Sequence, residues 1–120
     1  MMFLPEFSDV FEGANDVRLV RDRALDHWRT EGCEYQVRRT KGAREFDELL
    51  KKKLLEESFE AIHAGYEDLP HELADVLAVL QGIAERNGIE WEFVLEIAQK
   101  KESMTGPFKR GMVWDRTIEK

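Results

Sequence analysis

Acidic side chains are concentrated in one stretch of the sequence. Between Leu54 and Asp75 there are seven acids and no Lys or Arg, while acids and bases are equal in number over the rest of the chain. The whole net charge of −7 therefore lies in this stretch. Carboxylates at this density either face water or hold something positive, and the hard cations Mg²⁺ and Mn²⁺ are the ions that all-oxygen sites bind.

The first group of acids follows helical spacing. On a helix, Lys53, Glu56, Glu57 and Glu60 share one face, while Leu54, Leu55, Phe59 and Ile62 lie on the other. Taken alone, a Glu-rich helix face is typical of a solvated surface.

The second group of acids, Glu72 and Asp75, is more informative. These two residues and Gln81 are the only polar side chains between Glu72 and Ala84, so the helix that carries them is mostly buried. Burying two carboxylates without partners costs several kcal/mol. Pairing with Lys or Arg, protonation, or a bound cation would each relieve that cost.

A short turn makes the two acidic helices antiparallel neighbours. Glu72 and Asp75 then lie opposite Glu57 and Glu60. Lys53 alone does not neutralise four carboxylates, and oxygen-only ligation suits Mg²⁺ or Mn²⁺ rather than zinc. The alternative is a charge cluster at a helix end, paired with Lys and Arg from elsewhere in the chain.

Glycine and proline residues divide the chain into helices joined by short turns. We expect an all-α, four-helix bundle, with helices from about Asp16 to Gly32, Ala43 to Ala64, Asp68 to Asn87 and Glu90 to Ser103. Residues 33–40 are expected to form an extended connection or a short strand. The domain spans residues 16–114, after an arm of residues 1–15 and before a tail of residues 115–120. We expect apolar side chains of the arm to pack on a neighbour, and those near the C-terminus (Phe108, Met112, Val113 and Trp114) to pack on the bundle.

Composition narrows the class of protein. A chain of 120 residues with 42% hydrophobic and 36% charged residues is typical of one helix-rich globular domain. Its acidity argues against nucleic acid as a partner, and no apolar span is long enough for a membrane helix. A single cysteine, Cys33, and the lack of a signal-peptide pattern predict a cytoplasmic protein.

Other chemistry-bearing residues favour structural roles. The spacing of His63 and His71 fits no zinc motif, and Cys33 has no evident histidine partner. We expect the three tryptophans, Trp28, Trp91 and Trp114, in the core or at an interface, with stacking of one on a nucleobase as the alternative.

The acidic motifs resemble those of a known family. K-L-L-E-E-S-F-E followed by E-L-A-D resembles the E-E-x-x-E … E-x-x-D signature of the all-α nucleoside triphosphate pyrophosphatases, which include MazG-like proteins, dimeric dUTPases and phosphoribosyl-ATP pyrophosphohydrolases. V-R-L-V-R-D-R is similar to the K-L-V-R-D-K-I-P opening of small MazG-related house-cleaning proteins. The segment from Glu72 to Lys101 resembles their third and fourth helices, so the similarity covers about residues 16–114.

This resemblance implies Mg²⁺-dependent hydrolysis of a nucleoside triphosphate between the α- and β-phosphates, with Mn²⁺ as a substitute ion. It implies that Glu57, Glu60, Glu72 and Asp75 hold the first cation. Glu56 and Glu57 form the catalytic pair, in which Glu56 recruits a second ion or takes a proton from the attacking water. Candidates for binding the triphosphate are Lys53, Arg21, Lys100, Lys101 and Arg110. Asp22 reaches the site with Arg21 by the same resemblance, or forms a surface pair.

The sequence departs from the family pattern at two places. The opening R-D-K-I-P reads R-D-R-A-L here, and the family's R-G-G-F near the end of the fourth helix reads M-T-G-P-F. An arginine that contacts phosphate is therefore missing near Gly106, where Lys109 or Arg110 is the candidate substitute.

Two other functions are compatible with the same sequence. One is phosphoribosyl-ATP hydrolysis in histidine synthesis, which ranks lower because residues 16–42 are closer to the house-cleaning subgroup. The other is a helical dimerisation or protein-binding module without catalysis. For the enzyme we expect a homodimer or homotetramer, with the nucleotide site near a subunit boundary and a base that the motifs do not identify.

Overall fold

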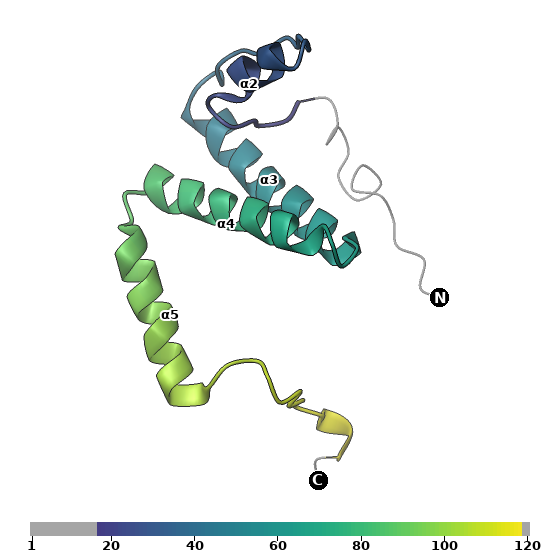
Figure 1. Cartoon of the computed structure of the whole chain (residues 1–120). Helices are drawn as coiled ribbons and strands as arrows, with labels where there is room; N and C mark the ends of the chain where they lie inside the picture. Colours follow the sequence, from purple (N-terminus) through teal and green to yellow (C-terminus); the bar gives the residue numbers. More distant parts are fainter. Residues whose placement is uncertain (1–16, 119–120) are drawn as a thin grey trace.

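The computed structural model describes residues 17–118, and this part of the chain is all-α (Figure 1). The helices are α2 (Ala24–Thr30), α3 (Ala43–His63), α4 (Leu69–Arg86) and α5 (Trp91–Thr105), followed by a 3-10 turn, η1 (Arg116–Ile118). The described residues include no strand, so the prediction of an all-α chain with four helices is confirmed. None of these helices is both long and apolar enough to cross a bilayer. The predicted arm, residues 1–15, lies outside the described residues, as does the end of the predicted tail, residues 119 and 120.

Helices α3 and α4 form an antiparallel hairpin (Figure 1). Residues 64–68 connect them, and α4 begins where predicted, with Asp68 at the N-cap position and Pro70 in the first turn, although Asp68 makes no capping hydrogen bond through its side chain. In the described part of the chain, the buried apolar side chains all lie on these two helices: Leu49, Leu50, Val79 and Ala84. The hairpin therefore holds the apolar core of the described residues, and a site can be built on it.

The prediction of the first helix is wrong for residues 17–23, which are not helical. Residues 18–21 are extended, and helix α2 begins only at Ala24. The apolar spacing of Val17, Val20 and Ala24 fits a helix, but ion pairs from Arg18 and Arg21 to the acidic helices hold this segment against the hairpin instead. Tertiary contacts therefore outweigh local helical preference here.

The predicted end of α2 is confirmed. Gly32 has a φ of +78°, which a residue without a Cβ adopts at no steric cost. This conformation lets the Cys33 N–H donate to the Trp28 carbonyl at 2.8 Å and the Gly32 N–H donate to that of Arg29 at 3.1 Å. Residues 33–40 then run as an extended connection, one of the two predicted alternatives, with Tyr35 packed edge-on against Trp28.

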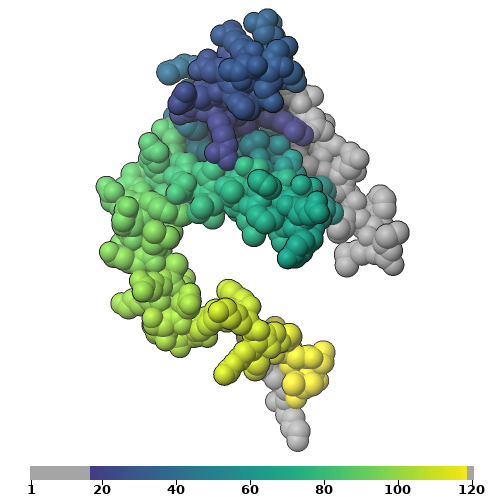
Figure 2. Space-filling model, viewed as in Figure 1, coloured from purple at the N-terminus to yellow at the C-terminus, as the bar shows by residue number. Residues whose placement is uncertain are grey.

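Helix α5 does not close a bundle with α3 and α4 within one chain. It leaves the end of α4 and points away from the hairpin, so the outline in Figure 2 is a C with a hollow between α4, α5 and the C-terminal segment. No residue of α5 is buried. The expectation that the C-terminal segment packs on the helices is also wrong, because Phe108, Met112, Val113 and Trp114 are all highly exposed. The physical reason for the course of α5 is the turn at Gly88, whose φ of +68° follows the end of α4 and after which the chain leaves the hairpin (Figure 1).

Candidate functional site

Three carboxylates meet where α3 faces the first turns of α4. Glu57, Glu72 and Asp75 each offer an oxygen, and these oxygens all lie within 4.8 Å of one another. The antiparallel hairpin places Glu72 and Asp75, which are three residues apart on α4, opposite the turn of α3 that carries Glu57, as the sequence predicted. Oxygen donors at this spacing form an appropriate set for a hard divalent cation.

The cluster contains buried oxygens without partners. The Glu57 side chain is 9% exposed, and among the described residues its Oε2 atom and that of Glu72 are buried with no hydrogen-bond donor. An unsatisfied buried acceptor costs about 1–3 kcal/mol, and more when it is charged. A cation bound between Glu57 and Glu72 would satisfy both oxygens, so the residues present fit a metal ion.

Glu60 lies one turn beyond Glu57 and belongs to the same electrostatic cluster. Partial burial of its carboxyl group and then the negative charge of Glu57 raise the pKa of Glu60 to about 7. The charges of Glu72 and Glu56 raise this pKa further. The structure therefore brings together all four carboxylates that the sequence nominated, with Glu60 at the more exposed margin.

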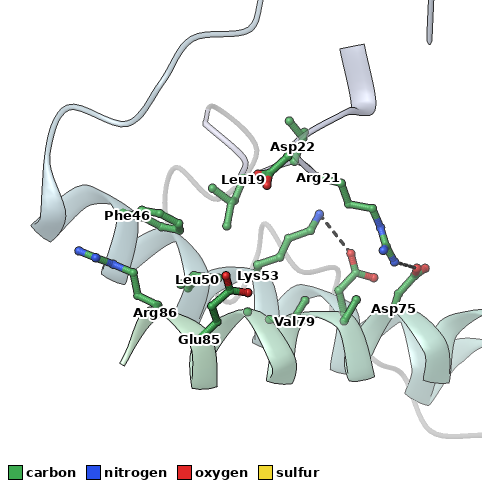
Figure 3. Close-up of a pocket in the computed structure, with 14 residues that line it drawn as sticks. Leu19, Arg21, Asp22, Phe46, Leu50, Lys53, Asp75, Val79, Glu85 and Arg86 are labelled. Carbon is green, nitrogen blue, oxygen red and sulfur yellow. Dashed lines mark hydrogen bonds and ion pairs between the residues drawn. The ribbon is translucent and has the colours of Figure 1, made fainter. Parts of the chain in front are cut away.

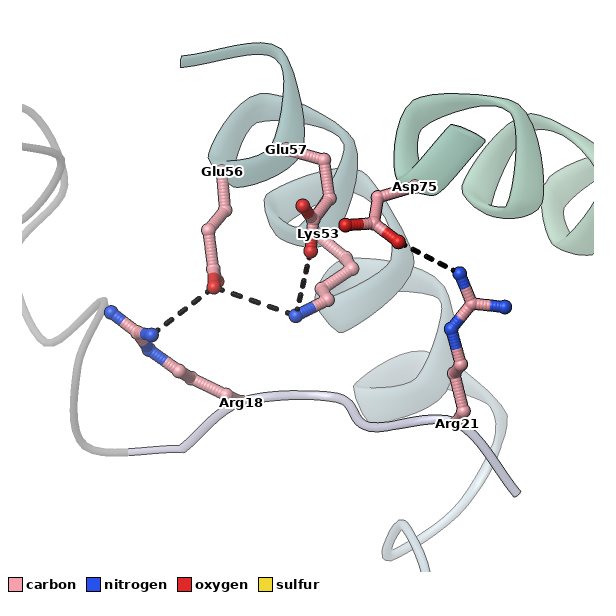
Figure 4. Close-up of polar contacts among 6 residues, drawn as sticks. All are labelled: Arg18, Arg21, Lys53, Glu56, Glu57 and Asp75. Atoms are coloured by element: carbon pink, nitrogen blue, oxygen red, sulfur yellow. Dashed lines mark hydrogen bonds and ion pairs between the residues drawn. The ribbon is translucent and has the colours of Figure 1, made fainter. Parts of the chain in front are cut away.

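Glu56 is oriented differently from Glu57. It is buried on the side of the N-terminal segment, where its carboxylate accepts from Arg18 at 3.1 Å and from Lys53 at 3.4 Å (Figure 4). Glu56 is not one of the three acids whose oxygens cluster. Its position fits a group beside the site rather than a ligand of the same ion.

Three cations surround the carboxylates. Lys53 bridges Glu56 and Glu57, at 3.1 Å from the latter, and Arg21 contacts Asp75 at 2.9 Å (Figure 4). Sequence reasoning nominated Lys53 and Arg21 but missed Arg18, whose signal was its place three residues before Arg21 in V-R-L-V-R. The cations partly neutralise the site, and they leave Glu72 without an ion pair among the described residues.

A cavity of about 650 Å³ extends from the cluster along the groove between α3 and α4 (Figure 3). Its α3 wall carries Phe46, Leu50, Lys53 and Glu57, and α4 contributes a stripe from Asp75 through Ala78, Val79 and Gly82 to Arg86. Residues 19–22 form the roof. A volume of 300–1,000 Å³ is typical of small-molecule sites. The cavity joins the carboxylates to Lys53 and Arg21, so it can hold an anionic ligand together with a cation.

Three of the nominated basic residues do not reach this cavity. Lys100 and Lys101 are exposed on the distal half of α5, and Arg110 is exposed in the segment after it. None of the three lines the cavity or pairs with the acidic cluster in the described structure. Within one chain the nomination of these residues as triphosphate ligands therefore has no geometric support.

The histidines and tryptophans lie apart from the cavity, within the part of the chain described. His63 packs on Phe59 and its Nδ1 lies 2.8 Å from the Phe59 carbonyl oxygen, which is a local helix-end role. The aromatic side chain that does line the cavity, among the described residues, is Phe46 on α3.

Comparisons with known proteins add no assignment. No protein-family model, no curated protein and no solved structure matches this chain. The resemblance to all-α pyrophosphatases therefore rests on K-L-L-E-E-S-F-E, E-L-A-D and V-R-L-V-R-D-R alone.

Proposed function

We propose that this protein is a Mg²⁺-dependent nucleoside triphosphate pyrophosphohydrolase of the all-α, MazG-like type. The observation that carries the proposal is the pair of buried, unpartnered oxygens of Glu57 and Glu72, which lie with Asp75 beside a nucleotide-sized cavity. A structural charge cluster would be expected to satisfy those oxygens with Lys or Arg, whereas a metal site leaves them available for the ion.

Each residue has a role that follows from its position in the site. Glu57, Glu72 and Asp75, with Glu60 at the margin, would hold Mg²⁺, which supplies stabilisation of negative charge on phosphate oxygens. Lys53 and Arg21 line the cavity beside these acids and provide N–H donors for the triphosphate. Glu56, held by Arg18 and Lys53, is fixed next to the site as an acceptor for a proton of the attacking water.

The products under this proposal are a nucleoside monophosphate and pyrophosphate, and the task is removal of non-canonical nucleotides in the cytoplasm. The house-cleaning assignment is supported by the opening V-R-L-V-R-D-R, because the first two arginines of this motif, Arg18 and Arg21, both contact the acidic helices. This is the part of the chain in which the resemblance to the house-cleaning subgroup lies.

The proposed enzyme is a homo-oligomer, in which a second copy of the chain covers exposed apolar residues. Leu73, Leu77 and Leu80 follow helical spacing on α4 and are exposed, and Phe93, Leu95 and Ile97 are exposed on α5. Exposed apolar side chains that share a helix face, as Leu73, Leu77 and Leu80 do, are typical of an interface. A homodimer or homotetramer would cover these side chains, and it would also give Lys100, Lys101 and Arg110 a route to the site of a neighbouring subunit.

The test is pyrophosphate release from a panel of canonical and modified nucleoside triphosphates and phosphoribosyl-ATP in the presence of Mg²⁺. Wild-type protein is expected to release pyrophosphate, and Glu57→Gln and Asp75→Asn are expected to lose at least about 100-fold, because each removes a charged ion ligand. Glu92→Gln makes a Glu-to-Gln change on exposed α5 and should keep full activity. No release from any nucleotide, or full release by both site variants, would reject the enzyme in favour of a non-catalytic helical module.

A further inference from the structure

We propose that residues 18–22 form a strap across the cavity, which opens at its α4 end when a metal ion binds Asp75 and closes again on a triphosphate through Arg21. This inference rests on the proposed function and adds a conformational step to it. The strap is extended through residue 21, and it roofs the cavity with residues that include Leu19 and Val20 (Figure 4).

Two ion pairs attach the strap to the hairpin. At one end Arg18 contacts Glu56 of α3 at 3.1 Å, and at the other Arg21 contacts Asp75 of α4 at 2.9 Å. Among the described residues, no hydrogen bond between backbone groups joins the strap to either helix. The strap is therefore held by side chains, and a change of charge at either ion pair can move it.

The two ion pairs differ in burial. The Glu56 side chain is 7% exposed and also contacts Lys53 at 3.4 Å, so the pair on α3 is enclosed and has a second cation. The side chains of Arg21 and Asp75 are 67% and 42% exposed. An exposed ion pair contributes little to stability, whereas breaking a buried pair leaves a poorly solvated charge. The pair on α4 is therefore the one that opens first.

Asp75 belongs both to the strap's attachment and to the proposed metal site. One of its oxygens lies within 4.8 Å of oxygens of Glu57 and Glu72, whose buried Oε2 atoms have no donor among the described residues. A divalent ion held by these three carboxylates places positive charge beside the Arg21 guanidinium and neutralises the charge that attracts it. The strap then loses its attachment to α4, while the pair on α3, outside the carboxylate cluster, remains.

The released arginine gains a new partner when a triphosphate is bound. Arg21 lines the cavity, as does Lys53. A guanidinium binds phosphate oxygens through two parallel N–H donors. Such a contact returns the α4 end of the strap to the cavity, now over the ligand, so the strap opens for the incoming nucleotide and then encloses its phosphates.

Backbone order parameters from NMR relaxation measure the strap in the full chain. Without metal, the amides of residues 19–22 should have order parameters near the value of about 0.85 that is typical of a rigid backbone. Saturating Mg²⁺ should lower these values below about 0.6. Mg²⁺ together with inorganic triphosphate, a probe that has no base, should restore the higher values.

Arg21→Gln tests the attachment to α4 directly. This variant should show the low order parameters of the strap without metal, and Mg²⁺ should lower them no further. The matched control is Arg29→Gln, which removes the exposed ion pair between Arg29 and Glu34 outside the cavity. The control should keep the wild-type values in all three conditions.

Calorimetric titration with Mg²⁺ distinguishes failure of the strap from failure of the proposed function. If Mg²⁺ binds but the order parameters do not change, the strap proposal is overturned and the metal site remains. A strap that stays ordered in metal-free Arg21→Gln, or stays mobile with inorganic triphosphate, also overturns it. If calorimetry detects no Mg²⁺ binding, the metal site and the metal-released strap are both rejected.

Discussion

Replacement of Glu72 by Gln should have opposite effects on stability with and without Mg²⁺. Glu72 has a buried Oε2 atom without a donor, and one of its oxygens lies within 4.8 Å of oxygens of Glu57 and Asp75. The amide of Gln keeps the shape of the side chain, removes its charge and adds an N–H₂ group beside the unpartnered oxygen of Glu57. Without metal, the variant should therefore be more stable than the wild type.

The size of this gain follows from the geometry. Two unit charges separated by about 4.8 Å repel by about 3 kcal/mol at an effective dielectric constant of about 20. Lys53 and Arg21 offset part of this repulsion, because they contact Glu57 and Asp75 at 3.1 and 2.9 Å. We therefore expect Glu72→Gln to raise the free energy of unfolding by about 1–2 kcal/mol in the absence of Mg²⁺.

With Mg²⁺ the order should reverse. A ligand at 100 times its dissociation constant stabilises the folded state by about 2.7 kcal/mol. The wild type should gain this amount, whereas Glu72→Gln, whose Mg²⁺ affinity should be about 100-fold lower without one charged ligand, should gain only about 0.4 kcal/mol at the same Mg²⁺ concentration.

Urea unfolding followed by circular dichroism, with EDTA or with Mg²⁺, measures both effects. All samples need one protein concentration, because the stability of an oligomer depends on it. Glu96→Gln on exposed α5 is the matched control and should change neither curve. A Glu72→Gln protein that is less stable than the wild type in EDTA, or that gains as much from Mg²⁺, would refute the interpretation of these carboxylates as a metal site.

Three further predictions follow from the same contacts. Because the pKa of Glu60 is raised to about 7, its contribution to stability is fully present below about pH 4.5 and is lost as the pH rises through 7. Mg²⁺ affinity should rise over pH 6–8, as the Glu60 proton leaves. Calorimetry at several pH values measures both profiles, and Glu60→Gln should flatten both. Arg21→Gln should raise Mg²⁺ affinity several-fold without nucleotide, since Arg21 competes for Asp75, yet raise the KM for the triphosphate; unchanged values of both would contradict the double role. Light scattering at micromolar concentration should detect a dimer or tetramer, which Leu77→Glu should dissociate, whereas a monomeric wild type would contradict the interface.

Helix limits on the hairpin could be predicted from sequence because local chemistry sets them. Pro70 fits only the first turn of α4, Gly88 takes a positive φ just past its end, and the limits of α3 and α4 fall within one or two residues of those expected. The pairing of two acidic groups followed from helical spacing and one short turn. These features depend on a few neighbouring residues, so a pattern in the sequence is enough to identify them.

The N-terminal segment, the course of α5 and the cavity were decided only by the tertiary structure. Local preference favoured a helix over residues 17–23, yet ion pairs from Arg18 and Arg21 to residues 38 and 54 positions away hold this segment extended. The acidic face of α3, which looks solvated in sequence, is the face that packs inward, so Glu56 and Glu57 are buried and Leu55 and Ile62 are exposed. Such outcomes depend on charges and surfaces brought together from distant parts of the chain, and spacing within one helix carries no information about them.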